Sequence, residues 1–199
     1  MNKKAQKILD TTTRLFLRDG VKKVTMDEIA GAAKASKVTV YKYFADKDTL
    51  YLHVGRAIAA EYAAQLRAVT ASREPLVAKL RAAVDSIAAF SDSGNYALCG
   101  ELAAYNHAVE TELAAYGQAC RDTLYTLIDA GLSAGCMKPG LDRDTLYHYI
   151  DMGVVYYRQN AEYRAKLNND PAFQARYMRF FIGNIFADGA AVLPEPGNE

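Results

Sequence analysis

The 199-residue sequence predicts an all-α protein of nine helices. Apolar residues recur at spacings of three and four along the chain, and residues typical of helix caps separate these periodic segments. No segment shows the two-residue alternation typical of strands. Because 51% of the residues are hydrophobic, the chain can bury a substantial core. We therefore expect a three-helix N-terminal head followed by a larger helical body.

The head begins with an expected helix over residues 3–19, which carries one apolar face and ends at Gly20. Thr25 and Glu28 have the spacing of a capping box, so the second helix should begin there. Ser36 offers an N-cap to a third short helix. Two short helices joined by a tight turn form a helix-turn-helix.

The second of these short helices must leave one side uncovered. The polar side chains that we expect to face outward are Lys37, Thr39, Lys42 and Tyr43. A helix of this kind fits a major groove about 12 Å wide, where it donates hydrogen bonds to phosphates and base edges. The sequence therefore predicts double-stranded DNA as a partner.

The charge of the chain is unevenly distributed. The formal net charge is only +1, but residues 1–56 carry twelve Lys and Arg against six Asp and Glu, while the remainder carries twelve against seventeen. A basic head favours a phosphate-containing partner and predicts affinity that falls steeply with salt. The alternative is that the lysines form an ordinary solvated surface.

Residues 25–50, T-M-D-E-I-A-G-A-A-K-A-S-K-V-T-V-Y-K-Y-F-A-D-K-D-T-L, resemble the DNA-binding segment of the tetracycline-repressor (TetR) family of one-component bacterial regulators. The resemblance covers about residues 5–55, and beyond them it is limited to length and helical pattern. It implies that Thr25 caps the second helix at a phosphate, and that Tyr41 and Lys47 hold the DNA backbone. The expected DNA-binding residues are Thr25, Ser36, Lys37, Val38, Thr39, Tyr41, Lys42, Tyr43 and Lys47, of which the resemblance places Lys37, Val38, Thr39, Lys42 and Tyr43 in the groove.

One turn residue departs from the family pattern. Lys34 occupies the position where the family usually has Gly. If the backbone needs a positive φ there, Lys carries a modest strain that Gly would avoid.

The body is expected to contain the remaining six helices. They span residues 47–71, 75–90, 96–116, 119–134, 143–167 and 171–187, with Gly117 as a break between the third and the fourth. The helix over residues 47–71 would link head and body across about 37 Å. These boundaries give a DNA-binding domain at 1–48, a ligand-binding and dimerisation domain at 49–190, and a tail at 191–199.

The last two expected helices are apolar on more than one side, so they need more partners than one body supplies. We expect a homodimer, which would meet two half-sites of a palindrome about 34–36 Å apart. The alternative is that these side chains fill an intramolecular core. The expected interface residues are Tyr149, Met152, Tyr177, Phe180, Phe181 and Asn184.

The aromatic residues of the body suit a cavity. The chain holds 14 Tyr and 7 Phe but no Trp, and phenol rings combine apolar faces with one hydrogen-bonding tip. Such a lining fits a drug-sized, partly aromatic or lipid-like effector, although aromatic residues at helical spacing also build ordinary cores. The expected ligand-binding residues are Tyr62, Phe90, Cys99, Tyr105, Asn106, Tyr125 and Tyr156.

The sequence offers little to catalysis, metals or membranes. It contains no nucleophile elbow, phosphate-binding glycine loop or paired-carboxylate motif, so we expect no catalytic residue and no cofactor. Cys99, Cys120 and Cys136 match no zinc spacing, and His107 with Glu110 is only a weak metal candidate. There is neither a signal core nor an apolar run long enough to cross a bilayer, so we expect a cytoplasmic protein with no membrane partner.

The favoured hypothesis is a ligand-responsive transcriptional regulator, with repression favoured over activation. It would bind a palindromic operator as a homodimer, and a small-molecule effector would release it from the DNA. A non-specific or architectural DNA binder would show the salt dependence without a preferred palindrome. A small helical enzyme using the Tyr-rich cavity would leave the recognition head unexplained.

Overall fold

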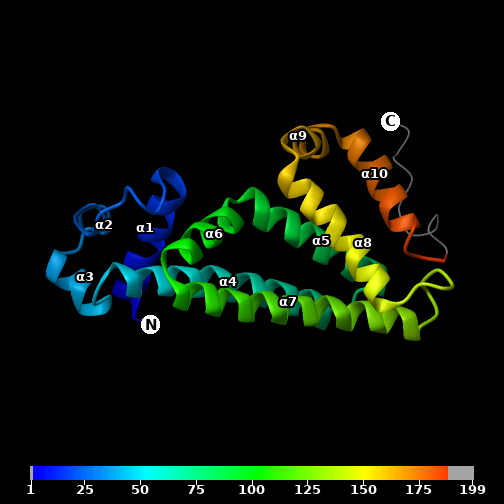
Figure 1. The fold of residues 1–199 in the computed structure, drawn as a ribbon, viewed down its shortest axis with the longest axis horizontal. Coiled ribbons are helices and arrows are strands. Elements are labelled where there is room, and N and C mark those ends of the chain that lie inside the picture. Colours follow the sequence, from blue (N-terminus) through cyan, green and yellow to red (C-terminus); the bar gives the residue numbers. More distant parts are fainter. Residues whose placement is uncertain (1, 188–199) are drawn as a thin grey trace. The chain divides into compact units, whose positions relative to one another are not determined.

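The structure, a computed structural model, describes residues 2–187, which form ten helices joined by short turns (Figure 1). The all-α class is confirmed, with one helix more than expected; the tail expected at 191–199 lies outside the described residues. The helices are α1 (Lys3–Asp19), α2 (Met26–Ala33), α3 (Lys37–Tyr43), α4 (Lys47–Ala71), α5 (Leu76–Asp92), α6 (Asn95–Tyr105), α7 (His107–Ser133), α8 (Arg143–Gln159), α9 (Ala161–Asn169) and α10 (Pro171–Gly183).

The break expected at Gly117 is wrong. Helix α7 runs through this glycine, and the chain breaks instead at Asn106, whose backbone is extended at φ −148° and ψ 114°. The Asn106 Oδ1 accepts the N–H of Ala108 at 2.9 Å, which satisfies a donor in the first turn of α7. A glycine inside a helix costs only about 1 kcal/mol relative to Ala, so Gly117 alone does not end α7.

The single helix expected over 143–167 is also wrong. Asn160 ends α8 with an extended backbone, and its Oδ1 accepts the N–H of Tyr163 at 2.8 Å to begin α9. Asparagine competes with the helix for its own backbone hydrogen bonds, and here that competition divides one apolar segment into two helices.

The residues group into two compact units. The first contains residues 1–65 and 89–120, and the second contains residues 66–88 and 121–199, of which the description ends at 187. Helices α4, α5 and α7 each pass from one unit into the other. The functional boundary expected near residue 48 lies inside the first unit and stays a prediction.

The core of the first unit joins the three N-terminal helices to α4, α6 and α7. Phe16, Ile29, Val40 and Phe44 are at most 2% exposed and belong to one buried cluster, as the apolar spacing predicted. The cluster continues into the other helices of the unit through Leu50, Val54, Leu98, Leu102 and Val109. Each such side chain contributes about 1.5–3 kcal/mol by leaving water, so the head is held to α4, α6 and α7 by a continuous apolar core.

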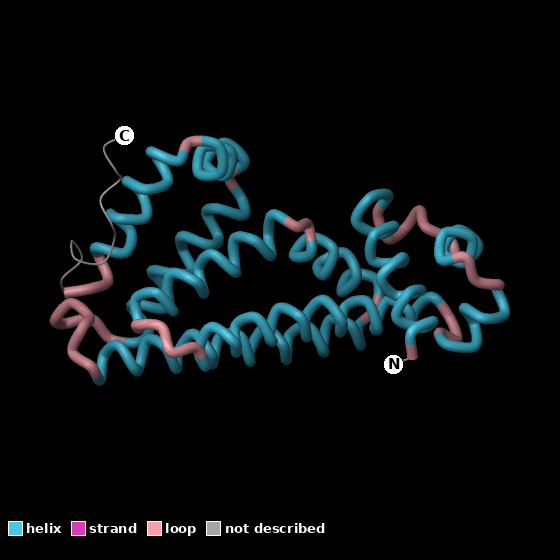
Figure 2. Tube along the Cα trace, turned by 180° about the vertical axis from the view of Figure 1, so that it is seen from behind, coloured by secondary structure: helices cyan, strands magenta, loops and turns pink. Residues whose placement is uncertain are grey.

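Within the first unit, the N-terminal parts of α4 and α7 lie side by side, as both views of the chain show (Figures 1 and 2). Gly55 permits the close approach, because a Cβ atom there would lie only 3.2 Å from the Val109 side chain. At the next residue, the Arg56 guanidinium pairs with the Glu112 carboxylate.

The second unit packs α8 and α10 against each other. The Phe181 ring lies over Gly153, where an added Cβ would come within 2.9 Å of it. The segment after α7 is fixed by an isolated antiparallel bridge between Met137 and Phe186. Among residues 2–187, no helix is long and apolar enough to cross a membrane.

Candidate nucleic-acid interface and ligand pocket

The predicted capping box at the start of α2 is confirmed. The Glu28 N–H donates to the Thr25 Oγ1 at 3.2 Å, and the Thr25 N–H donates to the Glu28 carboxylate at 2.7 Å. Hydrogen bonds from Thr25 lower the pKa of Glu28 below its ordinary value, and the bond from the Thr25 backbone N–H contributes most. The exposed start of α2 is therefore fixed by local contacts before any DNA is bound.

The turn between α2 and α3 has the positive φ at Lys34 for which the sequence analysis predicted backbone strain. Lys34 has φ 53° and ψ 45°, and among the described residues it is the only one other than glycine with a positive φ. Its N–H donates to the carbonyl of Gly31 at 3.1 Å, which closes the end of α2. The Lys34 side chain is exposed, so the strain belongs to the backbone alone.

Helix α3 has one buried and one exposed side, as expected. Ser36 caps it by accepting the Thr39 N–H at 3.1 Å, while Val40 is fully buried. On the other side, Val38 is 78% exposed. Lys42 and Tyr41 are exposed as well.

Lys37 and Tyr43, both among the expected DNA-binding residues, already contact side chains outside α3. The Lys37 ammonium donates to the Asp27 Oδ2 at 3.0 Å, and this hydrogen bond raises the pKa of Lys37. The Tyr43 hydroxyl accepts a hydrogen bond from the Asn2 side chain at 2.8 Å. Exposed ion pairs contribute little, so Lys37 can exchange Asp27 for a phosphate or a base edge at small cost.

Lys47 lies at the start of α4. Asp46 caps this helix by accepting the Thr49 N–H at 2.6 Å. The Lys47 ammonium is 5.6 Å from the centroid of the Tyr51 ring, which itself is buried. A lysine beside a helix N-terminus suits a phosphate oxygen, because both the ammonium and the free backbone N–H groups attract an anion.

A contact that the sequence did not predict ties α6 to the head. The Glu101 carboxylate accepts the backbone N–H of Val21 at 3.0 Å, just after α1 ends. Gly20 precedes it with φ 84°, a conformation that favours glycine, and a Cβ there would lie 3.7 Å from the Glu101 Oε1. No short motif could have revealed this contact, because its two residues are eighty positions apart.

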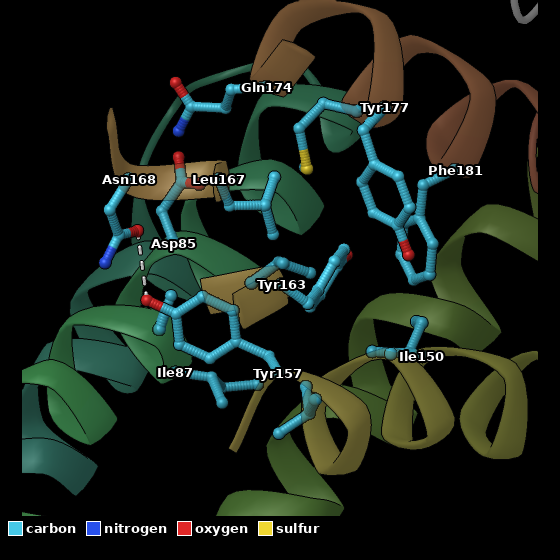
Figure 3. Close-up of a pocket in the computed structure, with 15 residues that line it drawn as sticks. Asp85, Ile87, Ile150, Tyr157, Tyr163, Leu167, Asn168, Gln174, Tyr177 and Phe181 are labelled. Atoms are coloured by element: carbon cyan, nitrogen blue, oxygen red, sulfur yellow. Dashed lines mark hydrogen bonds between the residues drawn. The ribbon is translucent and has the colours of Figure 1, made fainter. Parts of the chain in front are cut away.

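The second unit contains a pocket lined by α5, α8, α9 and α10 (Figure 3). Its walls are largely apolar and aromatic, and its volume of about 80 Å³ is several times the roughly 10–15 Å³ that one buried water needs. Figure 3 shows Tyr163, Tyr177, Phe181 and Ile150 at one end of the pocket, with Asp85, Asn168 and Gln174 toward the other. The Tyr157 hydroxyl donates to the Asn168 Oδ1 at 3.1 Å.

None of the seven expected ligand-binding residues lines this pocket. Tyr62 and Phe90 stack on each other in the first unit with ring centroids 4.4 Å apart, and Cys99 is half-buried in the same unit. Tyr105 and Tyr156 are 45% and 51% exposed. Asn106 caps α7, and Tyr125 packs on Tyr147. The pocket instead uses aromatic residues from the end of the chain. Helical spacing predicts that these aromatic residues lie on apolar helix faces. Which of their rings face the pocket depends on the break between α8 and α9 at Asn160.

The six expected interface residues fall into two groups. Met152 and Phe180 are 60% and 70% exposed, so their side chains are free to meet a second copy. Tyr177 and Phe181 line the intramolecular pocket, and Phe181 is only 6% exposed. The half-buried Tyr149 hydroxyl donates to the Phe181 carbonyl at 3.3 Å, and the Asn184 amide donates to the Phe180 carbonyl at 2.9 Å.

Nothing in the geometry activates the cysteine singled out in the sequence. Burial raises the pKa of Cys99 to about 11, which makes its thiol a poor nucleophile at neutral pH. The His107 Nδ1 lies 3.0 Å from the Glu110 Oε2 on an exposed turn. The described part of the chain contains no group of three side chains placed to hold a metal ion.

Comparison with known proteins gives the following similarities. Residues 8–54 match the family model described as "Bacterial regulatory proteins, tetR family". The HTH-type transcriptional activator FasR of Mycolicibacterium smegmatis is 33% identical over 137 residues, which are 64% of this chain and 60% of FasR. The chain therefore spans less than two thirds of that relative's length.

Two solved structures share the fold at lower sequence identity. The SmeT–triclosan complex superposes with a TM-score of 0.73 at 17% identity and covers 100% of both chains. The transcriptional regulator FadR from Bacillus subtilis in complex with stearoyl-CoA superposes with a TM-score of 0.61 at 18% identity, covering 79% of this chain and 88% of FadR. At these identities the likeness concerns the fold alone.

Proposed function

We propose that this chain, whose residues 8–54 match the TetR family of bacterial regulatory proteins, is a ligand-responsive transcriptional regulator that binds a palindromic operator as a homodimer. The observation that carries the proposal is the exposed side of α3. This helix is capped at Ser36 and anchored by the buried Val40, yet it leaves Val38 and Lys42 facing outward. An apolar side chain beside cationic ones on a short rigid helix fits the base edges and phosphates of a major groove.

In this proposal, the contacts to DNA divide into two classes. Thr25, Tyr41 and Lys47 hold phosphates and set the position of the head. Lys37, Val38, Thr39, Lys42 and Tyr43 face base edges, and Val38 contacts a thymine methyl group in the way that apolar side chains read that base.

The dimer is supported by an exposed apolar surface on α8 and α10. Met152, Val155, Tyr156 and Phe180 are each at least 37% exposed. Large exposed apolar side chains favour association with a second copy of the chain, and a two-fold dimer matches a palindrome.

The response to a ligand is proposed to act through helices that the two units share. An effector that stabilises one arrangement of the second unit would change the positions of the two recognition helices, and binding of effector and operator would then oppose each other by typically about 1–3 kcal/mol. The hydrogen bond between Glu101 and Val21 supports this coupling, because it links α6 directly to the residue that follows the end of α1.

We propose repression with release by the effector. Activation is the second candidate, and it is favoured by the similarity to FasR, which is named as an activator. A promoter fused to a reporter distinguishes the two, since deletion of the regulator would raise expression in the first case and lower it in the second.

Selection of bound fragments from random DNA, followed by salt titration, tests the proposal. We expect a palindrome to be recovered, and we expect Lys47→Ala to weaken all sequences alike and lower the salt slope by about one. Lys42→Ala should also change the base preference. Lys138→Ala removes the same charge from the second unit and should leave the slope unchanged. Recovery of no shared sequence would favour an architectural DNA binder instead.

A further inference from the structure

We propose that the pocket of the second unit binds a small apolar molecule that carries an amine or quaternary ammonium group, and that it discriminates against anionic amphiphiles. This inference deepens the proposed function, because the ligand would be the effector of the regulator. It assigns the effector's chemical class from the pocket alone.

The walls of the pocket include four aromatic rings, those of Tyr157, Tyr163, Tyr177 and Phe181. Tyr163 contacts two other rings of the lining, with its centroid 5.3 Å from that of Tyr177 and 6.4 Å from that of Tyr157. Tyr177 lies 6.1 Å from Phe181 at an interplanar angle of 19°. Aromatic faces carry negative potential, and several of them around one space attract an ammonium group as well as an apolar body.

The charge of the lining points the same way. Among the described residues that line the pocket, Asp85 is the one charged side chain, and none is Lys or Arg. Partial burial raises the pKa of Asp85, and the Arg81 guanidinium, whose Nε lies 3.9 Å from the carboxylate, lowers this pKa by less. A carboxylate in this position gains from a second cation and repels an anion.

The two cations of α9 have partners within the chain. Arg164 of α9 donates to the carbonyls of Tyr157 and Arg158, and the Lys166 ammonium lies 5.1 Å from the centroid of the Phe173 ring. A ligand carboxylate or phosphate would therefore meet Asp85 without a counter-charge from the lining.

Figure 3 shows how apolar and polar side chains are distributed along the pocket. Tyr177, Phe181 and Ile150 surround one end of the pocket, and Asp85, Asn168 and Gln174 lie toward the other. The apolar body would pack among the rings, and the ammonium would approach Asp85. The Asp85 side chain is 61% exposed, so it lies at the mouth, where a charged group can keep part of its hydration.

Calorimetric titration of the full chain with three probes tests the inference. The probes 4-phenylbutylamine, 4-phenylbutan-1-ol and 4-phenylbutyrate share one apolar body and differ in the charge of the head group. We expect the amine to bind at least about 10-fold more tightly than the alcohol, which corresponds to about 1.4 kcal/mol, and the carboxylate to bind most weakly. Equal affinities, tighter binding of the carboxylate, or no binding of any probe would overturn the inference.

Two variants locate the site. Asp85→Asn keeps the shape of the side chain and should remove the difference between amine and alcohol, whereas Asp151→Asn on α8 removes a carboxylate that does not line the pocket and should preserve it. Tyr163→Leu should weaken all three probes. If Tyr163→Leu fails to fold, the comparison of Asp85→Asn with the parent chain still tests the inference, because the exposed Asp85 side chain at the mouth of the pocket can be replaced without disturbing the core.

The outcome separates this inference from the proposed function. A protein that binds a palindrome but none of the probes overturns the ligand class and leaves the regulator intact. A protein that prefers the amine but ignores duplex DNA overturns the regulator and leaves the pocket's chemistry standing.

Discussion

Replacement of Glu101 by Ala should reveal how strongly α6 supports the head. The Glu101 carboxylate accepts the Val21 N–H at 3.0 Å, and the Val21 residue is fully buried. A buried N–H that loses its acceptor costs about 1–3 kcal/mol. Because Glu101 itself is half-buried and water can replace part of the contact, we expect a loss of about 1–2 kcal/mol. For a chain of this length, such a loss corresponds to a fall in Tm of roughly 2–8 °C.

Urea unfolding followed by circular dichroism measures this loss through the transition midpoint. Glu101→Gln keeps a carbonyl acceptor and should lose less than about 1 kcal/mol, while Glu110→Ala removes an exposed carboxylate whose partner is His107 and should stay within about 0.5 kcal/mol of the parent chain. Affinity for the selected operator should fall with Glu101→Ala, since the hydrogen bond positions the end of α1. The reasoning is refuted if the Ala and Gln variants are equally stable and neither differs from the parent chain.

Three further changes test local features of the first unit. Lys34→Gly should be more stable than Lys34→Ala, by up to about 1 kcal/mol in thermal unfolding, because both remove the charge but only Gly relieves the positive φ; equal stability would contradict the strain. Thr25→Ala should cost about 0.5–2 kcal/mol in the same measurement through loss of the cap, and Thr25→Ser should recover most of it. Burial raises the pKa of Cys99 from 9.0 to about 11, so at pH 8 its thiolate should be about two orders of magnitude scarcer than in the unfolded chain, and iodoacetamide should alkylate it slowly until urea is added. Because the pKa is raised on folding, the contribution of Cys99 to the free energy of unfolding is fully present below pH 9 and is lost as the pH rises toward 11. Fast alkylation of native Cys99 at pH 8 would contradict its burial.

The head could be predicted from the sequence because its determinants are local. The capping box of Thr25 with Glu28 and the cap at Ser36 each involve residues three apart. The buried side of α3 followed from apolar spacing, so the exposed side followed as well. Even the unusual turn was visible, since Lys34 occupies a position where glycine is expected.

The pocket could not be predicted in the same way, because its lining depends on where one helix stops. The break at Asn160 creates α9, and α9 supplies Tyr163 and Asn168. An uninterrupted helix over 143–167 would have aimed these side chains elsewhere. With that break unknown, the aromatic residues of α10 were assigned outward to a dimer interface, although Tyr177 and Phe181 line the pocket.

The contact of Glu101 with Val21 was equally invisible in the sequence. It joins residues eighty positions apart, and only packing of α6 against α1 brings them together. Spacing within one helix carries no information about such pairs.

The central claim is that the exposed side of α3 docks into DNA twice, from a symmetric pair of chains. Sedimentation velocity of the full chain with a fluorescently labelled palindrome, selected beforehand and held at low ionic strength, tests it in one measurement. The account predicts that the labelled duplex sediments with two chains bound, and that Lys47→Ala together with Lys42→Ala abolishes the complex. A chain that remains a monomer and leaves the duplex sedimenting alone would contradict it.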